Sequence, residues 1–143
     1  MRKKVAKSPT ARTLEACRKR GWLTDVTERR MGRFVTKDLF GFADLVAIIP
    51  GFTGATFIQV TSVGNRSART KKILDECTEQ AKIVLSAGNR IEIWGWGRYS
   101  WMRKDGTKAT KKRWDATRLE VVLQGTDMVA IELPRLSELR DST

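Results

Sequence analysis

Two apolar segments separated by a short turn constrain the fold of this chain more than any other feature. The first covers residues 37–49 and the second covers residues 56–63, with Pro50 and Gly51 in the turn between them. Short apolar runs that are rich in β-branched residues and bounded by turn residues are typical of buried strands. The sequence therefore predicts a hairpin of two adjacent strands in the interior of a sheet.

Polar residues interrupt these two runs at only a few places. Asp44 lies in the first run, and Gln59 and Thr61 lie in the second. A carboxylate or an amide at a core position is costly unless a partner satisfies it. In one register of the hairpin Asp44 lies opposite Gln59, with Thr61 two residues along the same face, whereas the other register places Asp44 opposite Val60. We favour the first register, because it gathers the polar atoms in one place.

The rest of the chain predicts an α/β fold with a mixed central β-sheet flanked by helices and a C-terminal β extension. In chain order we expect a helix over 8–20, a strand over 22–29, the hairpin, a long helix over 67–87 capped by Ser67, a strand over 90–96 parallel to the second hairpin strand, and closing strands over 114–123 and 128–133. No shift in composition divides residues 1–143 into two domains. Within this single domain we expect a basic arm over 1–7, a core over 8–98 and the extension over 99–143.

The chain is strongly basic. It has 28 Lys and Arg against 16 Asp and Glu, which gives a net charge of +12 at pH 7. Such an excess attracts polyanions, most often nucleic acid, although charge alone also fits a surface that only maintains solubility. The start of the predicted second helix carries Arg66, Arg69, Lys71 and Lys72, which either bind phosphates or form a solvated face.

Residues 97–113 form a hydrophilic connection with many lysines and arginines, and Tyr99 and Trp101 lie among them. Aromatic rings in a basic segment either stack on nucleic-acid bases or anchor a packed loop. The sequence leaves both roles open.

The absence of histidine from the sequence excludes Ser-His-Asp and Cys-His catalysis and histidine-containing zinc sites. The two cysteines, Cys17 and Cys77, are too few for a closed zinc site and fall on the apolar faces of predicted helices. We expect both to be buried thiols in a reducing compartment. No apolar stretch approaches the length of a membrane span or follows the charged N-terminus as in a signal peptide, so we expect a cytoplasmic protein with no membrane partner.

Oxygen-bearing side chains near the hairpin suggest a metal site. Asp44 and Gln59, with Asp38 and Glu28 nearby in the sequence, supply the oxygen ligands that Mg²⁺ prefers. A cation held there beside a basic surface would orient a phosphodiester and activate a water molecule. The alternative is structural: Asp44 caps a turn or pairs with an arginine, and Gln59 only hydrogen-bonds to it.

Residues 37–48, 57–62 and 65–73 resemble the core of the PD-(D/E)XK nuclease superfamily, closest to small phage and prophage proteins near the Holliday-junction-resolvase-like and VRR-NUC branches. The similarity runs from about Leu14 to Arg98, and it implies a restriction-endonuclease-like αβββαβ core. In that family an Asp at the start of the second strand and a Glu or Gln on the third bind the metal, and a Lys two residues later polarises the attacking water or the phosphate.

Asp44 and Gln59 match the two metal-binding positions, whereas Thr61 stands where the family has lysine. A hydroxyl cannot supply the positive charge of a lysine. The resemblance therefore implies that another lysine, Lys37, Lys71 or Lys72, reaches the site, or that catalysis is weak or lost. It also implies that Glu28 is the additional acidic residue of the family, and Asp38 is either a further ligand or a partner of Arg66 or Arg69.

Together these features predict a metal-dependent DNA endonuclease that uses Mg²⁺ or Mn²⁺. We expect Asp44, Gln59, Thr61, Glu28 and Lys71 to be catalytic, Asp44, Gln59 and Asp38 to hold the metal, and Arg66, Arg69, Lys72, Arg98 and Lys37 to contact DNA. The resemblance further implies a junction or flap substrate, a homodimer, and a bacterial or phage-infected cell. The alternatives are a catalytically degenerate DNA-binding accessory protein of the same fold and an RNA-binding module that needs no metal.

Overall fold

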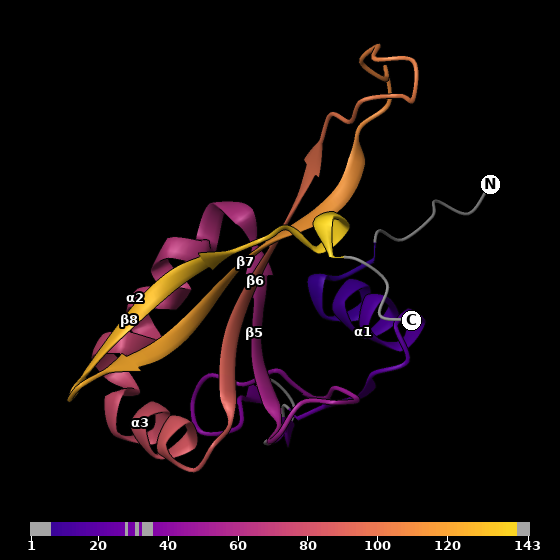
Figure 1. The fold of residues 1–143 in the computed structure, drawn as a ribbon. Coiled ribbons are helices and arrows are strands. Elements are labelled where there is room, and N and C mark those ends of the chain that lie inside the picture. The colour runs from indigo at the N-terminus through magenta and orange to yellow at the C-terminus, as the bar shows by residue number, and fades with distance from the viewer. Residues whose placement is uncertain (1–6, 28, 31, 33–35, 140–143) are drawn as a thin grey trace.

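The computed structural model describes residues 7–27, 29–30, 32 and 36–139, and it confirms the mixed α/β fold. One main sheet of six strands has helices on both faces (Figure 1). Its strands, in spatial order, are β1 (Leu23–Val26), β4 (Leu45–Ile48), β5 (Thr56–Ser62), β6 (Arg90–Tyr99), β7 (Arg113–Gln124) and β8 (Asp127–Leu133). A separate small sheet pairs β2 (Arg29–Arg30) with β3 (Thr36–Lys37).

The helices divide the molecule into three layers. Helix α1 (Pro9–Lys19) packs on one face of the main sheet, and α2 (Arg66–Glu76) and α3 (Thr78–Ser86) pack on the other (Figure 1). The predicted start and end of α1 are confirmed, because the Ser8 hydroxyl accepts the Ala11 amide and Gly21 has a positive φ of 77°. None of the helices that the structure describes is long and apolar enough to cross a lipid bilayer.

The favoured register of the central hairpin is confirmed. Strands β4 and β5 are antiparallel, with Leu45 opposite Ile58, and this register extended by one residue places Asp44 opposite Gln59. Strand β4 begins only at Leu45, because residues 38–44 form a tight turn in which the Leu39 and Ala43 backbones exchange hydrogen bonds of 3.0 and 2.9 Å. Asp44 therefore lies where a turn enters a strand. The parallel pairing expected for β5 and β6 is also observed.

The single long helix predicted over residues 67–87 is wrong, because the helix breaks at Cys77. The Cys77 backbone leaves the helical region (φ −112°, ψ 27°), and its amide donates to the Lys72 carbonyl five residues earlier at 3.2 Å. The Thr78 hydroxyl then donates to the Leu74 carbonyl at 2.6 Å. The break lets α2 and α3 follow the twist of the sheet separately.

The start of α2 also differs from the prediction. The short 3₁₀ helix η1 (Val63–Asn65) leads directly into α2, so Asn65 rather than Ser67 occupies the N-cap position. The Arg66 stem lies over β6, since a Cβ atom on Gly95 would lie 3.2 Å from Arg66 Cδ. Gly95 thus allows the N-terminus of α2 to approach the C-terminal half of β6 closely.

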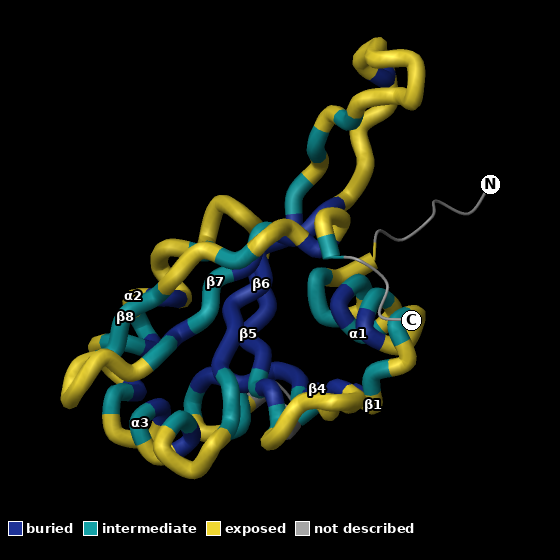
Figure 2. The backbone as a smooth tube through the Cα atoms, in the orientation of Figure 1, coloured by how far each residue is buried: buried dark blue, intermediate teal, exposed yellow. Residues whose placement is uncertain are grey.

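Strand β5 is buried along most of its length (Figure 2), because its side chains alternate between two faces of the sheet that are both covered by helices. Ile58 and Val60 face the α1 side, where they pack with Leu45 and Trp94. Gln59 and the other odd-numbered residues face α2 and α3, as the alternation of a strand requires.

The two cysteines are free and buried, as the sequence predicted. Cys17 lies in the core on the α1 side, and Cys77 lies in the core on the α2 side. Burial raises the pKa of Cys17 to about 11, so this thiol stays protonated at neutral pH.

A buried ionic cluster connects β6 and β7. Glu92 is 2% exposed and accepts a hydrogen bond of 2.9 Å from the Trp94 indole nitrogen. Its carboxylate lies 3.5 Å from the Arg118 guanidinium and 3.2 Å from that of Arg90. Burial lowers the pKa of Arg118, and the neighbouring Glu92 carboxylate opposes that shift. The cluster fixes the lateral packing of the two longest strands.

Strands β6 and β7 continue beyond the rest of the sheet and project from the body of the molecule (Figure 1). The hydrophilic connection predicted over residues 97–113 is therefore partly strand, since β6 reaches Tyr99 and β7 begins at Arg113. Both closing strands, β7 and β8, occur where the sequence predicted them. After β8 the short 3₁₀ helix η2 (Leu136–Glu138) returns to the α1 side, where Leu136 is buried.

Candidate functional site

Asp44 is held rigidly at the start of β4. Its backbone amide donates to the Ile58 carbonyl at 2.9 Å, and its Oδ2 atom accepts the Val60 amide at 2.7 Å and Gln59 Nε2 at 2.8 Å. The side chain is buried, with a residual exposure of 7%. Two donors on one oxygen fix the orientation of the carboxylate.

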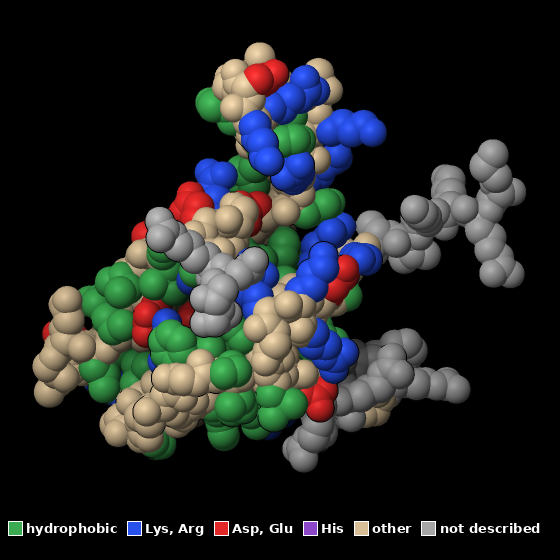
Figure 3. Space-filling model, turned by 45° about the vertical axis from the view of Figure 1, so that its right-hand side comes forward, with side chains coloured by type: hydrophobic (Ala, Val, Ile, Leu, Met, Phe, Trp, Pro, Cys, Tyr) green, Lys and Arg blue, Asp and Glu red, His purple; other side chains and the backbone are tan. Residues whose placement is uncertain are grey.

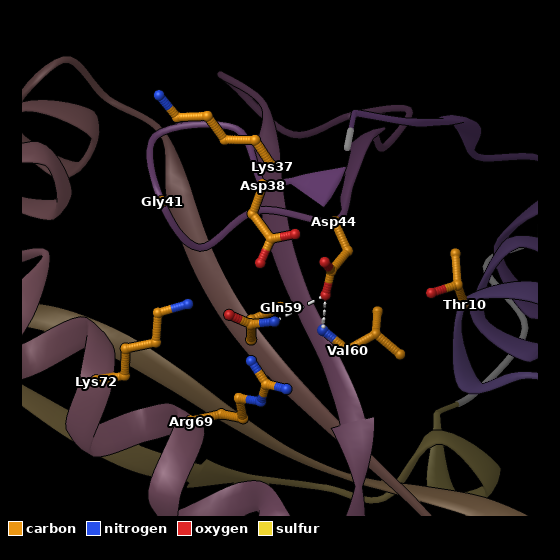
Figure 4. Close-up of a pocket in the computed structure, with 9 residues that line it drawn as sticks. All are labelled: Thr10, Lys37, Asp38, Gly41, Asp44, Gln59, Val60, Arg69 and Lys72. Carbon is orange, nitrogen blue, oxygen red and sulfur yellow. Dashed lines mark hydrogen bonds between the residues drawn. The ribbon is translucent and has the colours of Figure 1, made fainter. Parts of the chain in front are cut away.

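Gln59 is the most deeply buried polar residue of the site, at 1% exposure. Its Nε2 atom donates to Asp44, while its Oε1 atom is buried and accepts no hydrogen bond from the residues that the structure describes. Figure 4 shows Oε1 directed away from Asp44 and toward the side of Lys72. A buried carbonyl oxygen without a partner costs about 1–3 kcal/mol, so this atom favours a cation, a water molecule or a donor group beside it.

A cavity of about 540 Å³ opens over these two side chains (Figure 4). It is lined by Thr10, Lys37, Asp38, Gly41, Asp44, Gln59, Val60, Arg69 and Lys72. The lining combines three cationic side chains with two carboxylates. Such a mixture suits an anionic ligand together with a metal ion better than it suits an apolar ligand.

The turn before β4 contributes a second carboxylate. Asp38 lines the cavity, and Figure 4 shows its carboxylate directed toward Asp44 and Gln59. The neighbouring Lys37 also lines the cavity, but its ammonium group points away from the two carboxylates. Asp38 is therefore placed as a further oxygen ligand, whereas Lys37 is placed at the rim.

Helix α2 presents two cations to the cavity from positions three residues apart. Arg69 and Lys72 share one face of the helix, and both line the cavity. In Figure 4 the Arg69 guanidinium lies beside Gln59 and the Lys72 ammonium points inward. Lys71 is exposed and lies outside the lining, because one helical step of about 100° turns it away from its neighbour. Of the lysines considered as substitutes for the motif lysine, Lys72 points inward, Lys37 points away and Lys71 lies outside the lining.

The remaining predicted residues are not gathered at the cavity. Thr61 is buried on β5 on the same face as Gln59 but does not line the cavity. Arg66 forms an ion pair of 2.8 Å with Glu132 of β8, and Arg98 is exposed on β6. Glu28 lies outside the described residues.

Asp44, Asp38 and the Gln59 Oε1 atom are the ligands that a metal ion would use. Among the residues that the structure describes, no three acidic or thiol side chains are grouped closely enough to bind a metal by themselves. Two carboxylates and one amide oxygen suit Mg²⁺ or Mn²⁺, whose shells are usually completed by water and phosphate. The hydrogen bond between Gln59 and Asp44 is also the contact expected of a purely structural pair, so the unpartnered Oε1 atom is the feature that favours a ligand.

One polar side chain of the cavity lining, Thr10, was not singled out by the sequence. Thr10 comes from the first turn of α1, and only the tertiary packing of α1 brings it to the cavity. Lys72 was expected to contact DNA or to replace the motif lysine, but no local pattern distinguished it from Lys71. The start of α2, and hence which lysine faces the sheet, would have been needed to choose between them.

The chain was compared with known proteins at three levels. No protein-family model, no curated protein and no solved structure matches it. The fold and the site described above are therefore the basis for its function.

Proposed function

We propose that the protein is a metal-dependent DNA endonuclease of the PD-(D/E)XK type, which hydrolyses phosphodiester bonds with Mg²⁺ or Mn²⁺. The observation that carries the proposal is the buried Gln59 Oε1 atom, which has no partner among the described residues and lies beside Asp44 in a cavity lined by cations. Asp44, Asp38 and Gln59 would hold the metal.

The order of elements supports this assignment. Apart from the small sheet, helix α1 is followed along the chain by the three strands β1, β4 and β5. Helices α2 and α3 come next, and then β6, which is parallel to β5. Asp44 stands at the start of the second of these strands and Gln59 on the third, which are the positions of the metal ligands in the family that the sequence resembles. The order of the strands and the places of these two residues support the proposal.

The side chains around the cavity have complementary roles in the proposed reaction. Arg69 and Lys72 would bind non-bridging phosphate oxygens and stabilise the negative charge of the pentavalent transition state. Lys72 would also supply the positive charge that Thr61 lacks, approaching from α2 instead of β5. Asp44, fixed by two donors, would orient the attacking water together with Asp38. When bound, the metal supplies Lewis-acid activation of that water and of the phosphate.

A second candidate is a catalytically degenerate accessory protein that binds DNA with the same surface. The observation that favours it is the placement of Thr61, which is buried outside the cavity lining and cannot carry a charge. Both candidates have DNA as their partner. The family resemblance adds to the proposal a junction or flap substrate and a homodimer.

The test is cleavage of supercoiled plasmid, linear duplex and four-way-junction DNA by the wild-type protein. We expect product with Mg²⁺ or Mn²⁺ and none in EDTA, because the two carboxylates of the site need a divalent cation to accept a phosphate. Binding of the same substrates in EDTA should be measured in parallel. Salt-dependent binding without cleavage of any substrate would reject the enzyme and leave the accessory protein.

Two adjacent lysines of α2 provide a matched pair for testing the substitute lysine. Lys72→Ala is expected to lower the cleavage rate at saturating DNA by about 10²-fold or more, because it removes a charge aimed into the cavity. Lys71→Ala removes the same charge from the exposed side of the helix and should change that rate less than about threefold. Single-turnover kinetics with both variants separates them, and equal rates would reject the role of Lys72.

A further inference from the structure

Strands β6 and β7 form a two-stranded arm that stands away from the rest of the molecule. We define the β6–β7 arm as residues 98–114. The ladder of β6 and β7 ends at Tyr99 opposite Arg113; farther out an isolated bridge joins Met102 to Lys108, and the Arg103 amide donates to the Thr107 carbonyl at 2.8 Å. Figures 1 and 2 show the outer part of the arm projecting with its residues mostly exposed. The two sides of the arm are therefore held together beyond the strand ends by one isolated bridge and a few backbone hydrogen bonds.

The β6–β7 arm has a strongly positive charge. Residues 98–114 contain one acidic residue, Asp105, and seven basic residues: Arg98, Arg103, Lys104, Lys108, Lys111, Lys112 and Arg113. The acid, Asp105, accepts the Thr107 amide at 2.9 Å and the Thr107 hydroxyl at 2.6 Å, so its charge is engaged in closing the turn. Figure 3 shows lysines and arginines gathered over the projecting end of the molecule.

Arginine–aromatic stacks line the arm and its base. The guanidinium carbon of Arg113 lies 3.3 Å from the centroid of the Trp101 ring, within the arm. At the base, Arg12 of α1 stacks on Trp114 at 3.8 Å, and Arg135 stacks on Tyr99 at 4.3 Å. A guanidinium that lies flat on a ring keeps its N–H edges available for phosphate and has already lost side-chain freedom. These stacks distinguish the arm from a surface with freely moving charges.

The base of the arm lies close to the segment that leads into α2. A Cβ atom on Gly97 would lie 3.0 Å from Val63 Cγ1. From there α2 carries Arg66, which is paired with Glu132 at 2.8 Å, and then Arg69 and Lys72, which line the cavity.

We propose that the β6–β7 arm is a duplex-DNA clamp that enters the major groove and grips the flanking phosphates while the cavity faces the backbone of the same duplex. The inference rests on the proposed function for the choice of DNA as the polyanion. A two-stranded ribbon fits the major groove of B-DNA, which is about 12 Å wide. The major groove of A-form RNA is too deep and narrow for side chains to read, so double-stranded RNA is excluded as the preferred ligand.

The clamp is tested by removing three lysines of the arm together: Lys104→Ala, Lys108→Ala and Lys111→Ala. The control variant, Arg18→Ala with Lys19→Ala and Lys82→Ala, loses the same charge from the far end of α1 and from α3. Fluorescence anisotropy in EDTA with a duplex of about 20 base pairs measures affinity without cleavage. At about 0.15 M salt we expect the arm variant to bind between tenfold and a hundredfold more weakly, with the salt slope reduced by about 2.7, and the control to bind less than about threefold more weakly.

Each outcome separates the clamp from the nuclease. Equal losses in the arm and control variants would overturn the clamp in favour of a diffuse positive field. Equal or tighter binding of an RNA duplex, or an arm variant that changes only the oligomeric state in light scattering, would overturn it as well. If the wild type binds DNA through the arm but cleaves nothing, the proposed catalysis fails and the clamp stands. If the arm variant binds and cleaves like the wild type, the clamp fails and the nuclease stands.

Discussion

Replacing Asp44 with Asn is expected to abolish metal-dependent cleavage while leaving the fold intact. The amide oxygen of an Asn can still accept the Val60 amide and Gln59 Nε2, which now hold Asp44 at 2.7 and 2.8 Å. What the substitution removes is the negative charge that the metal requires. We expect the cleavage rate to fall at least about a thousandfold, which corresponds to roughly 4 kcal/mol of transition-state stabilisation. Single-turnover cleavage and calorimetric titration with Mn²⁺ measure the two losses independently.

Asp25→Asn is the matched control for Asp44→Asn. Asp25 lies on β1, opposite Val46 of β4; it is exposed, and its carboxylate accepts the adjacent Val26 amide at 2.9 Å. The Asp25→Asn variant should cleave DNA and bind Mn²⁺ like the wild type. If Asp44→Asn kept the wild-type rate with an unchanged thermal midpoint, Asp44 would be the structural partner of Gln59 and no metal ligand. If both the thermal midpoint and the cleavage rate fell, the rate would be measured again at a temperature at which the variant is folded. Dividing it by the folded fraction gives the rate per folded molecule.

The second large effect concerns stability and lies away from the cavity. Glu92→Ala is expected to lower the free energy of unfolding by about 3–5 kcal/mol, because it leaves a buried guanidinium without its carboxylate. Arg118 is 5% exposed, and the Trp94 indole N–H would also lose its acceptor. The loss is a large share of the roughly 5–15 kcal/mol that stabilises a typical domain. Urea-induced unfolding followed by tryptophan fluorescence measures it.

Glu120→Ala controls for the loss of one negative charge on the same sheet. Glu120 lies opposite Glu92 across the β6–β7 pair and contacts Arg90 at 3.4 Å, but it is only partly buried. Its removal should cost less than about 1 kcal/mol. Should Glu92→Ala fail to fold, Glu92→Gln retains an acceptor for Trp94 and gives a measurable midpoint. Equal losses for Glu92→Ala and Glu120→Ala would show that burial does not control the energy of this cluster.

The central hairpin was predictable because its information is local. The two apolar runs and the turn between them define strands, and the cost of burying scattered polar groups selects the register that the structure has. Asp44 and Gln59 therefore came together as expected. Asp38 was expected at the site only because it lies six positions before Asp44 in the sequence; the turn that brings it to the cavity was not predicted.

The parts that sequence reasoning missed depend on contacts between distant segments. Local propensity continues the helix through Cys77, and the break is tied to packing with the turn before β4. The buried partner of Glu92 lies 26 residues later, at Arg118, and only the register of β6 and β7 identifies it. Strand alternation alone does not decide whether Glu92 is exposed or buried.

The break at Cys77 also places that residue in contact with the turn that carries Asp38. A Cβ atom on Gly41 would lie 3.2 Å from Cys77 Sγ, so the turn that carries Asp38 rests directly on the end of the helix that carries Arg69. This contact is between uncharged atoms, and dissolved ions do not screen it. Ionic strength should therefore change how tightly the protein holds a polyanion, while the spacing between the acidic and basic walls of the cavity stays the same.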